Sequence, residues 1–413
     1  MMRSLHNRLY FLFTFAIASK VFESIFGEPI PSFLSSDTVH FLLTAILIIW
    51  TLVLVYPKYD MIKEVLLSQK WLLALYLFAL ISCSWSSDLA SSLRLIFLPL
   101  VLLISSAYIA LEFSPRQLID LTTNVTVIFA LGSIVGQLLL TSIVETALKG
   151  WVGIYGHKNY LGVGMAIGII CVLVSDSRWT ILRWCKLLLF VVILELSQSA
   201  TAIVAVVSVF GLIMLRRLSL RAIFSFAFLF MLAVVSVIWT SNVDNLVGQF
   251  FGLIGRDSTF TGRNATWYFI STQIMSHPLL GFGHEGFWIP HRDLVEATLG
   301  WYPGHSHNGF LDYALNYGIP SLLLLLAVLW GGLKTGFRVR MHQESVGTWL
   351  LLVIWLELLN NLTDVDYMAV QPLWLMFVIG LYSCCRFENK QESAVAETME
   401  PLNIHGEDEP IRG

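Results

Sequence analysis

Charged residues are scarce in this chain of 413 amino acids, where they occupy 13% of positions against roughly 25% in soluble domains. Basic residues are not in excess either, since 25 Lys and Arg stand against 28 Asp and Glu and leave a formal net charge of -3. The five cysteines form no CxxC pair or metal-type spacing, so we expect no disulfides. These absences exclude a cytosolic enzyme, a nucleic-acid-binding surface and a disordered chain.

The sequence is rich instead in long apolar runs, many close to the ~20 residues that a helix needs to cross a bilayer. They are continuously apolar rather than alternating, which predicts helices and not barrel strands. The predicted fold is therefore an all-α polytopic membrane protein with about twelve transmembrane helices. We expect them at residues 9–26, 39–56, 68–84, 93–112, 118–141, 160–175, 179–194, 198–215, 222–240, 308–333, 346–360 and 371–386.

Basic residues predict the orientation of these helices, because cytoplasmic loops carry the excess of Lys and Arg. The apolar stretch 179–215 is either one long helix or two short ones divided near Ser197. With the division and a cytoplasmic N-terminus, inner segments hold 18 Lys and Arg and outer segments hold 6; without it the count is 12 against 12. The division is therefore favoured, and both termini are expected in the cytoplasm.

The longest connection, residues 241–307, then faces outward within the membrane domain 1–386. It is too rich in tryptophan and phenylalanine for a disordered linker, so we expect it to fold at the membrane surface. The tail 387–413 is acidic and nearly free of aromatic residues, and we expect it to be disordered.

Histidines concentrate in this outer segment, and the densest stretch reads Gly304-His305-Ser306-His307-Asn308-Gly309. It leads directly into the predicted helix at 308, whose free backbone N–H groups would favour an anion such as phosphate. Histidine exchanges protons near neutral pH, so His307 is the candidate catalytic base. Asn308 and Asp312, on the same helical face, are expected to orient groups around it.

Basic residues near this stretch are candidates for binding a diphosphate. Arginine grips phosphate oxygens with two parallel N–H groups, which points to Arg256 and Arg263 beside flexible glycines. Lys158, at the outer start of the helix 160–175, is a third candidate. Lys20 and Glu23, close together in the first span, are interpreted as a structural pair.

Other polar and aromatic residues on the outer side are expected to contact substrate. His305, Glu195 and a late acidic and amide group are placed around the same cavity, and Trp288, Trp301 and Tyr302 can stack on sugar rings. The late group comprises Glu357, Asn360, Asn361, Asp364 and Asp366. A metal site built from the HxH sequence with His277, His284 or His291 is an alternative, but its spacing fits no familiar zinc signature, and we expect no metal.

At these residues the sequence resembles the O-antigen ligase and polysaccharide polymerase family of bacterial inner membranes. The family's ligase pattern is His, then Asn, Ser or Gln, nine residues and Gly, matched here by His307, Asn308 and Gly318, with Ser321 three places later. Several segments are more similar to the exopolysaccharide-polymerase branch: WVGIYGHKNYLG, LSQSATA, GRDSTFTGR and HPLLGFGHEGFW. Ala200 stands where many ligases carry an arginine, so Lys158 or Arg256 is expected to replace it.

The resemblance implies an inner-membrane glycosyltransferase acting on the periplasmic side. Its donor would be a polyprenyl pyrophosphate-linked oligosaccharide and its acceptor a glycan or lipid core, with no cofactor and no metal. A chain-length regulator and a flippase of the same pathway are the implied partners. In such a reaction His307 would deprotonate the acceptor hydroxyl for attack with inversion, while Arg263, with Lys158 or Arg256, would hold the pyrophosphate.

Three functions remain open at this level. The first is a polymerase that joins lipid-linked repeat units, and the second, with the same chemistry, is a ligase that moves finished glycan to a lipid core. The third is a transporter or flippase for lipid-linked sugar, which would place its polar groups near the membrane midplane. Their collection at one interface favours an enzyme.

Overall fold

The structure is a computed structural model that describes residues 2–21, 36–140, 150–214, 261–365, 367, 368 and 370–399. Over these residues it consists of helices without strands, which confirms the predicted all-α class. In chain order the elements are α1 (Met2–Ala18), α3 (Ser36–Val55), η2 (Tyr56–Lys58), α4 (Tyr59–Leu67), α5 (Lys70–Ser82), η3 (Cys83–Trp85), α6 (Leu89–Glu112), α7 (Pro115–Leu140), η4 (Gly153–Tyr155), α9 (Lys158–Val174), α10 (Ile181–Ser197), α11 (Ala200–Met214), α14 (Thr261–Ser276), α15 (Arg292–Leu299), α16 (Gly309–Tyr317), α17 (Ser321–His342), α18 (Glu344–Asn360) and α19 (Pro372–Met399).

Four helical stretches are long and apolar enough to cross a membrane: Phe41–Leu67, Leu89–Glu112, Pro115–Leu138 and Ser321–His342. Three shorter apolar helices accompany them, at Lys70–Trp85, Lys158–Val174 and Ala200–Ile213. These helices support a membrane protein, while the number of twelve spans stays a prediction. The predicted span 222–240 lies outside the described residues.

Two predicted boundaries were wrong. The span expected at 308–333 is broken, because α16 ends at Gly318, whose φ of +80° belongs to the left-handed region, and α17 begins at Ser321 after Pro320. The segment expected to be a disordered tail from 387 is helical as far as Met399, as the end of α19. By contrast, the predicted division near Ser197 is present, where Gln198 turns with a φ of +52°.

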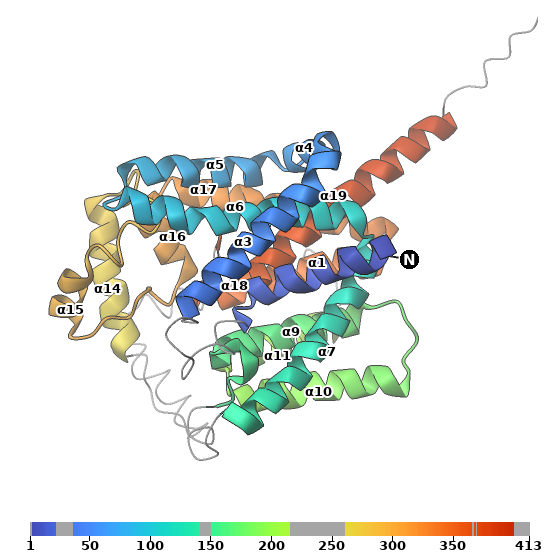
Figure 1. Cartoon of the computed structure of the whole chain (residues 1–413), viewed down its shortest axis with the longest axis horizontal. Coiled ribbons are helices and arrows are strands. Elements are labelled where there is room, and N and C mark those ends of the chain that lie inside the picture. Colours follow the sequence, from blue (N-terminus) through green and yellow to red (C-terminus); the bar gives the residue numbers. More distant parts are fainter. Residues whose placement is uncertain are drawn as a thin grey trace, which may run out of the picture.

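The centre of the bundle is α9, which is buried at every position from Leu161 to Val172. A helix that is apolar all round can be buried on all sides, and glycines let its neighbours approach closely. At Gly162 an added Cβ would lie 2.7 Å from the Cβ of Ser199, so the turn before α11 packs directly on the first turns of α9. Among the described helices, α3 is the opposite case and lies across the outside of the bundle, mostly exposed (Figure 1).

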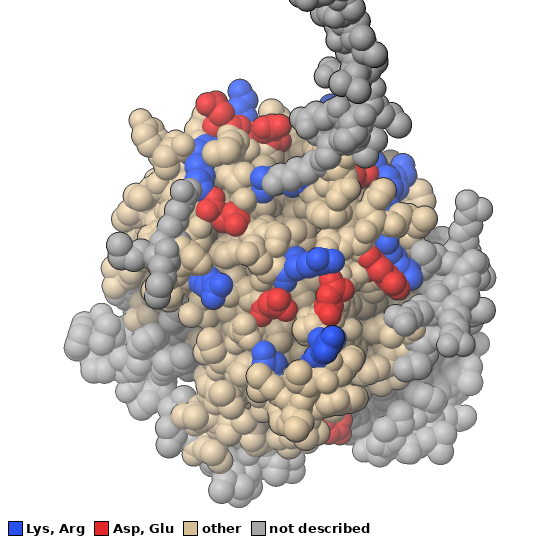
Figure 2. All heavy atoms as spheres, turned by 90° about the vertical axis from the view of Figure 1, so that its right-hand side faces the viewer, with Lys and Arg blue, Asp and Glu red and all other residues tan. Residues whose placement is uncertain are grey.

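The two ends of the bundle differ in chemistry. At one end, interactions between charged and polar side chains connect α1, the α3–α4 bend, the α6–α7 and α9–α10 turns and α19. They include Asn7 to Glu112, Lys58 with Glu112, Arg116 with Asp176 and Arg338 with Glu388. Lysine, arginine and acidic side chains gather on this end (Figure 2). The start of α1 and the end of α19 also lie at this end (Figure 1).

At the opposite end, α14, α15 and α16 form a separate layer (Figure 1). This layer has its own apolar cluster, in which Phe269 and Ile270 of α14 pack with Phe287, Val295 and Leu315. Backbone hydrogen bonds attach the 281–284 segment to α16, and the side chains of Ser82 and Ser92 attach it to α5 and α6. The described part of the predicted outer segment is thus folded and fixed to the bundle.

The contact at Gly162 provides a test of this packing. Replacing Gly162 by Ala should lower the thermal stability of the purified protein, because overpacking a tight contact costs about 1–3 kcal/mol. Gly331→Ala on α17 is the matched control, since nothing lies within 4 Å of its added Cβ. Unfolding midpoints measured in detergent should fall for Gly162→Ala and stay level or rise for Gly331→Ala, and equal midpoints would contradict the packing.

Candidate functional site

The candidate site begins in the loop that leads into α16. His307 adopts a left-handed backbone with a φ of +55°, which is uncommon for a residue other than glycine. In this conformation its N–H donates to Nδ1 of His305 at 3.2 Å, and the two imidazole rings lie 4.1 Å apart edge to face. The loop therefore presents two histidines side by side as one unit.

The start of α16 leaves no backbone donor free for an anion. Asn308 is its N-cap, and its Oδ1 accepts from the N–H groups of Phe310 and Leu311 at 3.1 Å. The N–H of Gly309 donates to the carbonyl of Asn361, and that of Asp312 to the carbonyl of Asn308. The expected phosphate site at this helix end was wrong, because the protein itself uses all four donors.

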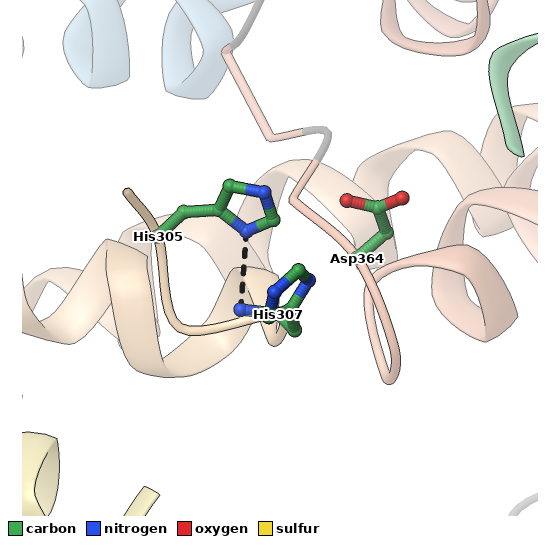
Figure 3. A group of neighbouring side chains, drawn as sticks. All are labelled: His305, His307 and Asp364. Atoms are coloured by element: carbon green, nitrogen blue, oxygen red, sulfur yellow. Dashed lines mark hydrogen bonds between the residues drawn. The ribbon is translucent and has the colours of Figure 1, made fainter. Parts of the chain in front are cut away.

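The turn after α18 docks on this helix start. An added Cβ on Gly309 would lie only 2.0 Å from Oδ1 of Asn361, and Asn308 Nδ2 donates to the carbonyl of Leu362 at 3.4 Å. This contact brings Asp364 beside the histidine pair. One ligand atom from each of His305, His307 and Asp364 lies within 4.8 Å of the others, and the three side chains converge from two chain segments (Figure 3).

Asp364 is also tied to the centre of the bundle. Its Oδ2 accepts from Nδ2 of Asn159 in the first turn of α9 at 3.2 Å, while Oδ1 of Asn159 accepts from Ser199 at 3.2 Å. The hydroxyls of Thr201 and Thr363 lie 2.6 Å apart and form a hydrogen bond. Segments that are distant in sequence, around residues 159, 199, 307 and 364, thus meet at one site.

The surroundings keep the histidines uncharged at neutral pH. The pKa of His307 is lowered to about 4, first by burial and then by the neighbouring His305 and Arg263, against the opposing charge of Asp364. Burial also lowers the pKa of His305. Arg263, half-buried on α14, is therefore close enough to influence both imidazoles, as the sequence predicted for a residue of the same site. A neutral imidazole next to a carboxylate and a guanidinium is suited to accept a proton.

The alternative metal site considered from the sequence combined the HxH histidines with His277, His284 or His291. His284 is buried and its Nδ1 lies 2.6 Å from the hydroxyl of Tyr317, while His277 and His291 pack against the ring of Phe282. None of these three is among the described residues grouped closely enough to share a metal with His305 and His307. The donors that could do so are the two histidines and Asp364, a mixed nitrogen and oxygen set with room for a further ligand.

Two of the predicted site residues, Asp312 and Trp288, are buried and have structural roles. Asp312 is 4% exposed, and its carboxylate accepts from the backbone N–H of Ser306 at 2.9 Å and from Nε1 of Trp288 at 2.7 Å. It therefore positions the histidine loop. Trp288, expected to stack on a sugar, is 3% exposed within the apolar cluster, so the expectation was wrong for this residue.

The other predicted residues divide into three groups. Lys158 is the first residue of α9, next to Asn159. Glu195 is exposed near the end of α10, Trp301 is 45% exposed, and Tyr302 packs beneath the guanidinium of Arg292, with no described contact to the histidines. Arg256 lies outside the described residues. Asn159 and Ser199 had no expected role, although both lie within segments that carry the family resemblance.

The buried carboxylate of Asp312 generates a prediction about the loop. Asp312→Ala should lower the unfolding midpoint of the purified protein, because it leaves two buried N–H donors unsatisfied at about 1–3 kcal/mol each. Asp293→Ala, which removes an exposed carboxylate on α15, is the control and should leave the midpoint unchanged. Indistinguishable midpoints for the two variants would show that Asp312 does not hold the loop.

Comparison with known proteins agrees with this geometry. Residues 184–326, which include Ser199, Arg263 and both site histidines, match the family described as O-Antigen ligase. The chain is also 30% identical over 289 residues to the "Exopolysaccharide production protein ExoQ" of Rhizobium meliloti (strain 1021). That match covers 63% of this chain and 64% of the relative, so the chain spans slightly less than two thirds of the relative's length. Both matches agree with the resemblance of the sequence to the O-antigen ligase and polysaccharide polymerase family.

Proposed function

We propose that this membrane protein is an inverting glycosyltransferase that polymerises polyprenyl diphosphate-linked oligosaccharides. The observation that carries the proposal is the neutral imidazole of His307, placed beside the carboxylate of Asp364 and within the electrostatic influence of Arg263. A transferase of this kind needs a base for the acceptor hydroxyl and cations for the departing diphosphate. His307 is the candidate base and Arg263 a candidate cation, and the two lie near each other in the structure.

The chemistry needs few groups because diphosphate is already a good leaving group. His307 takes the proton of the acceptor hydroxyl as its oxygen attacks the anomeric carbon of the donor sugar. The bond between that carbon and the diphosphate oxygen breaks, and the electron pair leaves with the diphosphate, whose charge Arg263 neutralises. Asp364 then stabilises the imidazolium that has formed, and a single displacement inverts the anomeric configuration.

The location of the site favours transfer over transport. Transporters place their polar groups near the middle of the membrane on broken helices. Here His305 and His307 directly precede α16 and Arg263 lies on α14, and α14, α15 and α16 form the end of the bundle opposite the ion-paired end (Figures 1 and 2). In the proposed orientation this end faces the periplasm and both termini face the cytoplasm of a bacterial inner membrane.

A polymerase is preferred to a ligase because of the similarity to an exopolysaccharide production protein. A ligase that uses a lipid core as acceptor is the second candidate, since the matched family is described by that activity. The two share the donor chemistry and differ in the acceptor.

The test of the proposed activity uses purified protein in lipid vesicles with a lipid-linked oligosaccharide. A ladder of longer lipid-linked products is expected from a polymerase, and a single transfer to added lipid core from a ligase. His307→Gln should reduce product formation by about 10²–10⁴-fold, the range of general base catalysis. His342→Gln, an exposed histidine in the last turn of α17, is the control and should behave as wild type.

Two further outcomes bear on this test. Added chelator should leave the ladder unchanged if the histidines act as a base and not as metal ligands. A ladder of normal rate from His307→Gln would remove the proposed base.

The lowered pKa of His307 predicts the pH dependence. Because the imidazole loses its proton near pH 4, kcat/KM should rise with pH below about 5 and be flat from pH 6 to 8. With an ordinary histidine pKa of about 6.5, kcat/KM would instead be at half its maximum at about pH 6.5. A profile of kcat/KM against pH, measured at fixed ionic strength, separates the two; a half-maximum near pH 6.5 would contradict a buried base.

A further inference from the structure

A second cation lies near the site on a helix that the family match does not include. Lys20 follows the end of α1 in a left-handed conformation, with a φ of +54°, and is half-buried. Its ammonium lies 5.4 Å from the centre of the Tyr160 ring, in the first turn of α9 and one residue after Asn159. Among the described residues no carboxylate lies within ion-pair distance of it, and its predicted partner Glu23 is outside them.

The charge of Lys20 acts on the histidines of the site. Burial lowers the pKa of His305, and among the nearby cations Lys20 and Arg263 lower it further. Burial also lowers the pKa of His157, where both Lys158 and Lys20 contribute. Lys20 therefore lies close enough for its charge to act on His305 and His157, beside Lys158, which the sequence favoured.

The Tyr160 ring fixes the position of Lys20 without neutralising it. A cation over an aromatic face keeps its charge, and the N–H groups that point away from the ring stay available to an acceptor. A half-buried ammonium held in an uncommon backbone conformation is a costly arrangement that a nearby anion stabilises.

We propose that Lys20 binds the diphosphate of the lipid-linked donor together with Arg263. The assignment rests on the proposed function. One guanidinium does not balance a diphosphate in the presence of the Asp364 carboxylate, whereas a guanidinium and an ammonium supply two positive charges. Because α1 runs along the bundle from the opposite end (Figure 1), Lys20 also connects the diphosphate site to the membrane-embedded part of the molecule.

The test measures binding without turnover. Radiolabelled undecaprenyl diphosphate, which carries no glycan, is titrated onto protein in nanodiscs in which His307 is replaced by Gln. Lys20→Met should weaken binding about tenfold or more, because a contact with a charged group is lost, whereas Lys20→Arg should keep most of it. Methionine preserves the length of the side chain and a favourable contact with the Tyr160 ring, so the fold should persist; unfolding midpoints check this.

The matched control is Lys334→Met. Lys334 lies 5.3 Å from the centre of the Trp330 ring on α17, so it has the same cation and ring geometry away from the site and should bind the probe as the parent does. Unlabelled inorganic pyrophosphate should compete with the probe, and phosphatidylglycerol should not; competition by phosphatidylglycerol alone would mean that Lys20 holds a lipid headgroup. Unchanged binding by Lys20→Met, or a loss with Lys158→Met alone, would overturn the assignment.

The outcome is separable from that of the proposed function. If wild-type protein forms the polymer ladder and Lys20→Met binds the probe normally, only the role of Lys20 fails. If Lys20→Met loses the probe while wild-type protein transfers no glycan to any acceptor, the diphosphate site stands and the proposed reaction fails.

Discussion

The site depends on one contact, the docking of the turn after α18 on the first turn of α16. It is possible only because Gly309 has no side chain, since an added Cβ would meet Asn361 at 2.0 Å. The backbone bond from Gly309 to Asn361 and the bond from Asn308 to Leu362 fix the turn in place. Asp364 is thereby held next to the histidine loop, although the loop lies some 60 positions earlier in the chain. Every further feature of the site follows from this juxtaposition.

The same contact determines how an anion can be bound. Because Asn308 and Asn361 use the backbone donors at the start of α16, the helix end serves the architecture of the loop and leaves anion binding to side chains from other helices. Arg263 on α14 and Lys20 after α1 are placed to do this from two sides. The base and the cations then come from different segments, and burial together with the positive charge of Arg263 keeps His307 neutral.

Sequence reasoning located most of the helices, because apolar runs bounded by turn residues reflect the local demand of the membrane. It also singled out His307 and Arg263 as candidates, since titratable residues were concentrated there. It failed where tertiary contacts decide the outcome. Gly318 and Pro320 break what hydropathy shows as one span, and Trp288 is buried by a cluster that no local pattern reveals. Asp364 and Lys20 were visible as polar residues in apolar surroundings, but only packing shows which partner each one meets.

The central claim is that one end of the bundle holds the diphosphate and the base together. The most direct measurement is a cryo-EM structure in nanodiscs with a non-transferable donor analogue. In this phosphonate a methylene group replaces the ester oxygen between the sugar and the diphosphate. The account predicts density for the two phosphorus groups between Arg263 and Lys20, with the anomeric carbon facing His307. Density for the analogue at the opposite end, among Lys58, Arg116 and Arg338, would contradict it.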